Sequence, residues 1–378
     1  MCQNLPDAIS SCKLHFMTNN TNPTKSYDSA SIKKLAKSEV EITGSIAAEA
    51  WEKFRSQALK NVNDSITVDG FRKGQVPENI LVSKVGDRVI NEEMAEIALS
   101  RAYIDILVDN KIDAIGKPIV GITKLAKGNP LEFKATTAVV PEITLPDCQK
   151  IAAAEVKKAS GIDVSVSDKD VEDSILKIRK SRASHEGHDH EKLTPEEHEK
   201  AIMDTLPEFN DEFVRGLGND FKDIADFKIK VREMISENKK DEAREKSRIM
   251  IADALGDATE AELPEIMIES ELNRSQTQFE HDIEKMGVKM DDYLKHAKKS
   301  LEDIRKDWRP HAERKAKLQL ILNTIAVKEN IKPDQKEIDS EVDHIVEHYK
   351  EADRERAAAY AETVLTNEKV FQWLENDK

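Results

Sequence analysis

The chain has 378 residues, of which 35% are charged and only 5% aromatic, and its formal net charge is −15. The length suffices for two or three domains, and the charge argues against a general binder of nucleic acid or acidic membranes, which would present excess Lys and Arg to phosphates. The high charge and low aromatic content favour long solvated helices over a thick globular core.

The first residues do not resemble a secretory signal, because MCQNLPDAISSCKLHF has neither a basic start nor an uninterrupted apolar stretch. No other segment approaches the apolar run of about 20 residues that a membrane span requires. The three cysteines, Cys2, Cys12 and Cys148, form no CxxC pair and no even framework, so they predict neither a zinc site nor a disulfide scaffold. We therefore expect a soluble protein of the reducing cytoplasm.

Residues 1–36 are predicted to be a flexible leader, because their second half is polar and rich in turn-forming residues. Met17 lies inside this leader and is an alternative start. Residues 37–147 are predicted to form an α+β domain. Val40 and Ile42 alternate within a short half-buried strand, and Ser45 offers an N-cap for the helix that follows.

Two helices and a hairpin are predicted in the rest of this domain. Apolar residues recur at helical spacing in two stripes: Trp51, Phe54, Ala58 and Val62, then Ile90, Met94, Ile97, Ile104 and Val108. The segments KPIVGITKLA and LEFKATTAVV are separated by the turn residues Gly128, Asn129 and Pro130. These segments predict a β-hairpin.

A glycine-containing loop separates the two predicted helices. The segment ITVDGFRKGQVP holds three residues suited to a loop that leads into a helix: Gly70, Gly74 and Pro77. Between the glycines lie Phe71, Arg72 and Lys73. An exposed aromatic side chain beside two cations is suited to binding a protein surface and adjacent phosphates. An isolated GFRKG is more often a solvated turn. The interpretation of this loop as a binding site therefore depends on its position between two helices.

Residues 148–183 are predicted to connect the domains through an extended stretch near 151–156 and a helix that starts at Ser167. Residues 184–205 are predicted to be a polar linker. Its spacing HxxHxH places three histidines close together: His185, His188 and His190. Imidazoles in this spacing can bind zinc, nickel or copper, but a solvated linker is the favoured interpretation because no ordered elements or Cys frame the segment.

Residues 206–378 are predicted to be almost entirely helical. The helix boundaries fall at Gly218, Pro264, Gly287 and Pro333. Four stripes mark the buried faces: Phe209, Phe213 and Leu217; Phe227, Val231 and Ile235; Leu272, Phe279, Ile283 and Met286; Ile338, Val342, Ile345 and Tyr349. The stripes are narrow and the polar faces wide, so these helices are expected to pair into thin arms.

The loop from Gly70 to Pro77 resembles the ribosome-docking signature of the trigger factor family, and it lies between two helices as in that family. Two further segments support the resemblance. LPEFNDEFVRGLG resembles the re-entry into the family's helical C-terminal domain, and RPHAERKAKLQLILNTIAVKENIK resembles its arm helix. The similarity runs from about residue 37 to 378 with one gap. It implies an α+β ribosome-binding domain followed by an extended, mainly α-helical domain.

The gap falls where the family has an isomerase domain. After the helix that corresponds to residues 167–183, the family carries an FKBP-like prolyl-isomerase module of about 90 residues. Here only about 20 polar residues separate Ala183 from Leu206. Such a segment is too short to close a sheet around an apolar proline pocket. We therefore expect no prolyl-isomerase activity.

The resemblance implies an ATP-independent chaperone that docks at the ribosome exit tunnel through Phe71, Arg72 and Lys73. The expected partners are a large-subunit protein and RNA at the tunnel exit, and unfolded or nascent polypeptides; no membrane and no DNA are expected. Apolar patches rimmed by charge suit weak binding of many sequences, and methionines such as Met250, Met267, Met286 and Met290 offer adaptable contacts. Because the docking face is exposed when the protein is off the ribosome, it can pair with itself, and a homodimer of the free protein stays an open alternative.

No catalytic or nucleotide-binding motif is present: GxSxG, GxxxxGK[ST], GxGxxG after a strand and HExxH are all missing. Neither a catalytic residue nor a cofactor is therefore expected. Two alternatives to the co-translational chaperone stay open. The first is a ribosome-independent holdase or assembly chaperone, and the second, less favoured, is a peptidyl-prolyl cis-trans isomerase.

Overall fold

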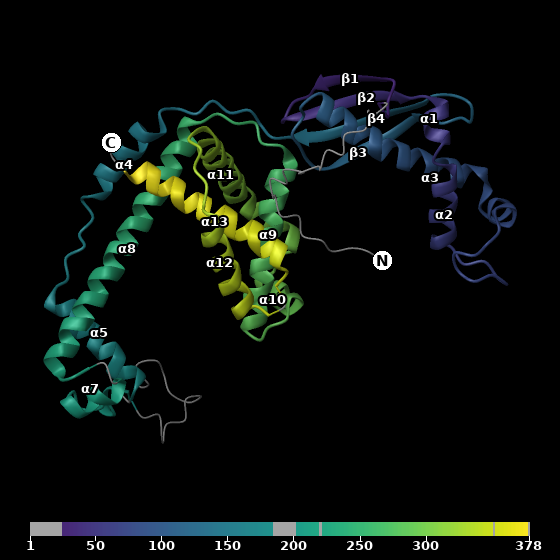
Figure 1. Cartoon of the computed structure of the whole chain (residues 1–378). Helices are drawn as coiled ribbons and strands as arrows, with labels where there is room; N and C mark the ends of the chain where they lie inside the picture. The colour runs from purple at the N-terminus through teal and green to yellow at the C-terminus, as the bar shows by residue number, and fades with distance from the viewer. Residues whose placement is uncertain (1–24, 184–201, 219–220, 351, 377–378) are drawn as a thin grey trace. The chain divides into compact units, whose positions relative to one another are not determined.

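The computed structural model describes residues 25–183, 202–218, 221–350 and 352–376 (Figure 1). The chain divides into two compact units. The first combines the part up to Leu145 with Thr259–Val370, and the second combines Pro146–Ala258 with Phe371–Lys378. The predicted helical domain 206–378 is therefore shared between two units. The physical reason is that its first long helix, α8 (Ile224–Ala258), packs on helices that precede residue 206.

An antiparallel sheet of four strands lies in the first unit, in the order β1-β2-β4-β3. The strands are β1 (Ser29–Lys34), β2 (Glu39–Ile46), β3 (Ala114–Lys124) and β4 (Leu131–Val139). The register sets Ile42 of β2 opposite Ile32 of β1 and Ala135 of β4. The predicted hairpin is confirmed by β3 and β4, whose connection contains the expected turn residues.

The strand β1 corrects the predicted leader 1–36. It pairs with β2 from Ser29 opposite Ser45 to Lys34 opposite Val40. The sequence gives little sign of this strand, because its side chains are mostly exposed and do not alternate between apolar and polar. Backbone pairing with the edge of β2 decides it. The remaining predictions for this segment, at Cys2, Cys12 and Met17, fall outside the described residues.

Three helices accompany the sheet: α1 (Ala48–Glu52), α2 (Arg55–Ser65) and α3 (Glu78–Asp109). The helix α3, kinked at Gly86, runs along one face of the sheet, and α1 and α2 pack against it (Figure 1). Trp51 is fully buried in this core, and its indole Nε1 donates a hydrogen bond to the carbonyl oxygen of Asn129 at 3.0 Å. Residues from both layers complete the core: Ile42, Ile46, Leu81, Ile90, Ile106, Leu131 and Phe133.

Two predictions about these helices are wrong. Ser45 does not cap a helix, because β2 continues through it to the fully buried Ile46. The predicted stripe of α3 is confirmed at Ile90 and Met94, which are buried, and is wrong only at its C-terminal end. Ile104 and Val108 are 43% and 66% exposed, whereas small alanines form much of the buried face. That face consists of Leu81, Ile90, Met94, Ala95, Ala98, Leu99, Ala102 and Ile106. Because alanine side chains are small, they allow the helix backbone to lie close to the sheet, and they occupy this face in place of larger residues.

The first unit also contains a helical part, made of α9 (Glu265–Lys285), α10 (Met290–Ala297), α11 (Leu301–Lys328), α12 (Gln335–His348) and most of α13 (Arg354–Glu375). The helices α9 and α11 form an antiparallel pair, and we call it the arm hairpin. The ring of Phe279 in α9 packs edge to face on Trp308 of α11, with centroids 5.2 Å apart, and on Tyr293 of α10, with centroids 5.3 Å apart.

The helix ends in this part agree with the predicted boundaries, but two stripes end early. Pro264 and Gly287 flank α9, and Pro333 precedes α12. Ile283 is buried whereas Met286, the last residue of its predicted stripe, is 70% exposed. Tyr349 is likewise 68% exposed. Both lie at or beyond the end of their helices, where the helical periodicity no longer sets the direction of the side chain.

The second unit is built on α8, with α4 (Cys148–Ala159), α5 (Asp168–Ser181) and α7 (Asp211–Leu217) packed against it (Figure 1). The predicted extended stretch near 151–156 is wrong, because these residues lie inside α4. Asp147 caps this helix by accepting a hydrogen bond from the backbone of Lys150, and three consecutive alanines favour the helix. The predicted cap at Ser167 is confirmed, and it forms a capping box with Asp170.

None of the helices in the described part of the chain is long and apolar enough to cross a membrane.

Candidate functional site

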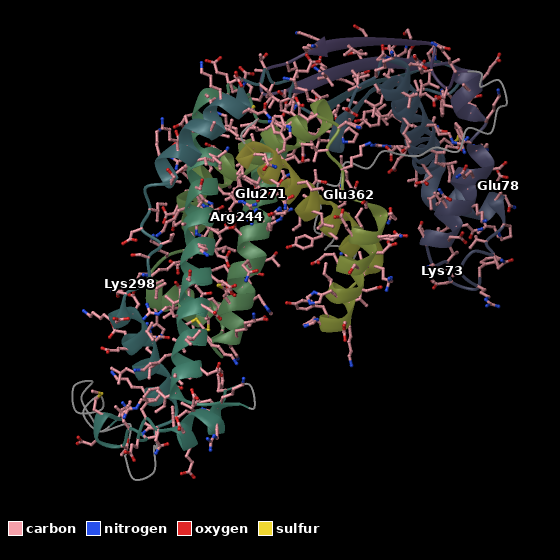
Figure 2. The ribbon with its side chains drawn as sticks, turned by 60° about the vertical axis from the view of Figure 1, so that its left-hand side comes forward. Lys73, Glu78, Arg244, Glu271, Lys298 and Glu362 are labelled. Atoms are coloured by element: carbon pink, nitrogen blue, oxygen red, sulfur yellow. The ribbon has the colours of Figure 1, made fainter. Side chains whose placement is uncertain are left out.

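The loop between α2 and α3, which we call the docking loop, spans residues 66–77. Phe71 at its tip is 37% exposed, and Arg72 and Lys73 beside it are exposed as well. Neither cation makes an ion pair with any residue that the structure describes. Figure 2 shows Lys73 at the far end of the α2–α3 hairpin. The loop therefore presents one aromatic ring and two unneutralised charges to the solvent.

Two buried valines anchor the base of the docking loop. Val68 and Val76 are 7% and 4% exposed and belong to the core of the sheet domain. Between them the backbone makes two turns. The amide of Phe71 donates to the carbonyl of Val68 at 3.1 Å, and the amide of Gln75 donates to the carbonyl of Arg72 at 2.9 Å. The tip is thus short and held at both ends.

The two glycines of the loop adopt backbone angles that suit glycine. Gly70 has φ of 85° and Gly74 has φ of 81°, the region that side chains with a Cβ avoid. These angles reverse the chain on either side of residues 71–73. Pro77 ends the loop as the N-cap of α3, one residue earlier than the first-turn position that the sequence suggests. The docking loop therefore contains all six of the residues predicted for it: Gly70, Phe71, Arg72, Lys73, Gly74 and Pro77.

Sequence reasoning missed the contacts that support the docking loop from α2. The side chain of Asn63 makes hydrogen bonds to both backbone groups of Val76. Arg55 at the start of α2 contacts Glu78 at 3.1 Å and Asp87 at 3.9 Å. An amide side chain just before a glycine-containing loop was the only available signal for the first contact. The second depends on how α2 and α3 pair, which the sequence pattern does not specify.

The helical part of the first unit exposes several apolar side chains. Met286 is exposed, whereas Met267 is buried in the arm hairpin, and Met250 of the second unit and Met290 are half-buried. The further exposed apolar side chains of this part are Val288, Val327, Tyr349, Tyr360 and Val364. Of the four methionines singled out in the sequence, Met286 has the exposure expected of a client contact.

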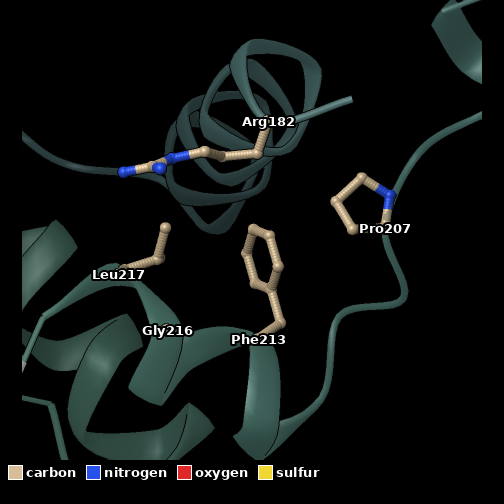
Figure 3. Close-up of a pocket in the computed structure, with 5 residues that line it drawn as sticks. All are labelled: Arg182, Pro207, Phe213, Gly216 and Leu217. Atoms are coloured by element: carbon tan, nitrogen blue, oxygen red, sulfur yellow. The ribbon is translucent and has the colours of Figure 1, made fainter. Parts of the chain in front are cut away.

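A small open pocket of about 220 Å³ lies in the second unit (Figure 3). Its lining combines one cation, Arg182 at the end of α5, with apolar groups of Pro207, Phe213 and Leu217, and Gly216 completes it. Phe213 itself belongs to an aromatic cluster with Phe209, whose ring centroid lies 6.3 Å away. This geometry suits packing of the helices, and its lining carries no pair of acid and base for catalysis.

The predicted metal candidates His185, His188 and His190 lie outside the described residues. Within the described ranges, no group of three or more His, Cys, Asp or Glu side chains is arranged to hold a metal ion. Cys148 is buried, and its thiol donates to the carbonyl oxygen of Pro146 at 3.4 Å. A buried thiol in this setting is a packing residue.

Comparisons with known proteins agree with this architecture. Residues 29–178 match the family model described as "Bacterial trigger factor protein (TF)", and residues 223–376 match the one described as "Bacterial trigger factor protein (TF) C-terminus". Together they span most of the chain. A solved structure of the trigger factor chaperone, from work on promiscuous substrate recognition in folding and assembly, shares the fold. Its TM-score is 0.50 at 18% identity, with 91% of this chain and 99% of that chain covered.

Curated relatives give the same result. The trigger factor of Moorella thermoacetica is 25% identical over 386 aligned positions, which cover 82% of this chain and 85% of the relative. The trigger factor of Staphylococcus epidermidis strain RP62A is 26% identical, with 79% and 84% covered. Because 82% of 378 residues is about 310, about 76 of the positions aligned with the Moorella protein have no residue from this chain. This chain belongs to the bacterial trigger factor family of chaperones.

Proposed function

We propose that this chaperone docks at the tunnel exit of the large ribosomal subunit through Phe71, Arg72 and Lys73 and shields nascent chains without ATP in the cytoplasm. The observation that carries the proposal is the docking loop, which exposes an aromatic ring and two unpaired cations on an acidic protein. The cations are drawn to RNA phosphates while the rest of the surface is repelled, so the loop also sets orientation.

Co-sedimentation with bacterial ribosomes tests the docking. The variant Phe71→Ala/Arg72→Ala/Lys73→Ala is expected to lose at least tenfold in affinity, because it lacks the apolar anchor and two phosphate contacts. A matched control is Ile119→Ala/Lys117→Ala/Lys127→Ala, which also removes one exposed apolar side chain and two positive charges from the same domain. The control is expected to bind like the native chain. Equal binding by both triple variants would reject docking through this loop.

The ribosome-independent holdase is the second candidate, and the exposed Met286, Tyr349 and Tyr360 favour it. Their side chains are available for client binding whether or not a ribosome is present. Suppression of aggregation of an unfolded client, measured without ribosomes, separates the two activities. The docking-loop variant is expected to retain this suppression in full. If the native chain suppresses aggregation but never binds ribosomes, the holdase is the function.

We also propose that the chain is not a prolyl isomerase. The alignment leaves about 76 positions of the Moorella trigger factor without a counterpart in this chain, which is close to the size of the family's prolyl-isomerase module. The two family models also leave residues 179–222 of this chain unmatched between them. Refolding of a protein limited by proline isomerisation is expected to keep its uncatalysed rate, with a time constant of about 10–100 s, when this chain is added. Acceleration proportional to chain concentration would contradict the proposal.

A further inference from the structure

Asn63, in the last turn of α2, bonds to the far side of the docking loop. Its side-chain Nδ2 donates to the carbonyl oxygen of Val76 at 2.8 Å, and the amide of Val76 donates to its Oδ1 at 3.1 Å. Its own carbonyl oxygen accepts a hydrogen bond from the amide of Gly74 at 3.2 Å. One residue therefore makes three hydrogen bonds to two residues that follow it by 11 and 13 positions, and together these bonds close the loop around residues 70–74.

We propose that Asn63 is a positioning residue for ribosome docking, which holds Phe71, Arg72 and Lys73 in their binding arrangement before the partner arrives. This inference rests on the proposed docking function. Ordering a glycine-containing loop on binding costs conformational entropy, and a loop that is already closed avoids that cost. If the competent conformation were only fractionally populated, the apparent dissociation constant would rise by the inverse of that fraction.

The chemistry of the side chain explains why asparagine suits this position. A primary amide carries a donor and an acceptor on one group, so it can bond the N–H and the C=O of a single residue. Aspartate keeps only the acceptor, and alanine keeps neither. The two side-chain bonds are partly buried, which reduces competition from water. The anchored residue, Val76, is itself in the core, so the clamp ties the loop to a fixed point.

Neighbouring contacts show that the clamp is specific to Asn63. Asn61, two residues earlier on the same helix, donates one hydrogen bond to Glu93 of α3 at 2.7 Å, and Glu93 lies outside the loop. Its replacement removes a side-chain hydrogen bond of the same kind from the same helix. Asn61→Ala is thus a matched control that reports the general cost of losing an α2–α3 contact.

Ribosome affinity measured over a series of salt concentrations tests the proposal. Asn63→Ala is expected to weaken binding about tenfold, the effect of losing one to two hydrogen bonds that order the loop. The slope of log affinity against log salt is expected to stay unchanged, because the number of phosphate contacts is the same. Lys73→Ala, in contrast, is expected to reduce that slope by about one. Asn61→Ala is expected to alter neither quantity.

Hydrogen exchange at the amide of Val76 supplies a readout that does not depend on ribosomes. Asn63→Ala is expected to remove its protection, and Asn63→Asp, which keeps the acceptor, is expected to restore it and to bind ribosomes better than Asn63→Ala. Native affinity in Asn63→Ala, or a changed salt slope, would overturn the positioning role. If the native chain itself fails to bind ribosomes, the docking role of both proposals falls, while unprotected Val76 in Asn63→Ala would still show that Asn63 closes the loop.

Discussion

Arg309 of α11 and Glu265 of α9 form an ion pair with two parallel hydrogen bonds. The guanidinium Nη1 donates to Oε1 at 2.6 Å, and Nη2 donates to Oε2 at 2.7 Å. The hydrogen bonds from Arg309 hold the pKa of Glu265 below its ordinary value of 4.5, against the opposing effect of partial burial. This fork joins the two helices of the arm hairpin at the start of α9, directly after Pro264.

The pair is expected to stabilise the arm hairpin modestly, because both side chains are more than a third exposed and solvent screens them. A double-mutant cycle with Arg309→Ala and Glu265→Ala is expected to give a coupling energy of about 0.5–1 kcal/mol. Since the pKa of Glu265 is lowered in the folded state, its contribution is present above pH 4.5 and is lost as the pH falls through the folded pKa. Hydrogen exchange of peptides from α9 and α11 measures the stability of the arm hairpin in each variant. A coupling energy of zero between the two substitutions would contradict a stabilising role for the ion pair.

The carboxylate of Asp170 in the second unit is expected to titrate unusually low. Lys239 donates a hydrogen bond to it at 2.9 Å, and the backbone amide and hydroxyl of Ser167 add two more, so the pKa falls from 3.8 to about 2. A lowered carboxylate pKa stabilises the fold above pH 3.8 and loses that effect as the pH falls towards 2.

Carboxyl NMR titration of labelled aspartates checks this value. Lys239→Met is expected to raise the pKa of Asp170 towards its ordinary value, because the leading donor is removed. The neighbouring Lys240→Met is the control, since Lys240 is exposed and is not among the groups that shift this carboxyl. A pKa that stays at about 2 in Lys239→Met would assign the shift to the Ser167 cap alone.

Gly44 of β2 lies directly opposite Phe133 of β4, and the aromatic ring covers it. A Cβ placed on Gly44 would meet the ring Cζ at 2.6 Å and the carbonyl oxygen of Ser29 at 3.2 Å. Phe133 is fully buried, so its ring has little room to move. Gly44→Ala is therefore expected to destabilise the sheet domain by about 1–3 kcal/mol through overpacking.

Urea unfolding followed by the fluorescence of the buried Trp51, in a background in which Trp308 and Trp373 are replaced by Phe, measures this effect. Adding Phe133→Leu to Gly44→Ala is expected to recover part of the lost free energy of unfolding. The double variant is therefore expected to lose less stability than the two single variants lose together. Gly121→Ala in β3 is a control, because its Cβ would meet nothing closer than 3.9 Å. Equal costs for Gly44→Ala and Gly121→Ala would show that the ring yields easily.

Tyr103 of α3 has a buried hydroxyl without a hydrogen-bond partner among the described residues. Burial raises the pKa of Tyr103, and the nearby Thr137 side chain offsets only part of this rise without satisfying the hydroxyl. Because an unsatisfied buried hydroxyl carries a desolvation cost, Tyr103→Phe is expected to leave the stability unchanged or to increase it by up to about 1 kcal/mol. A loss of 1 kcal/mol or more in urea unfolding would reveal a hydrogen bond that this geometry does not contain.

Local signals in the sequence determined much of the architecture. Ser167 marked the start of α5, and Pro264 and Gly287 marked the ends of α9, because caps and breakers act within one helical turn. The same holds for the docking loop. Its glycines, its exposed Phe71 and its cations could be placed between two helices from residue types and spacing alone. The resemblance to the trigger factor family rested on these motifs, and the family models then showed membership.

Contacts between distant residues were decided only by the tertiary structure. The strand β1 forms through backbone pairing with β2, in which Ile32 lies opposite Ile42, although its own side chains barely alternate. The buried face of α3 follows alanines, since close approach to the sheet outweighs side-chain size. Likewise Asn63 bonds to Val76 only when α2 and the loop are folded together. Local propensity is written along the chain, whereas pairing of edges, choice of face and closure of a loop depend on which surfaces meet in three dimensions.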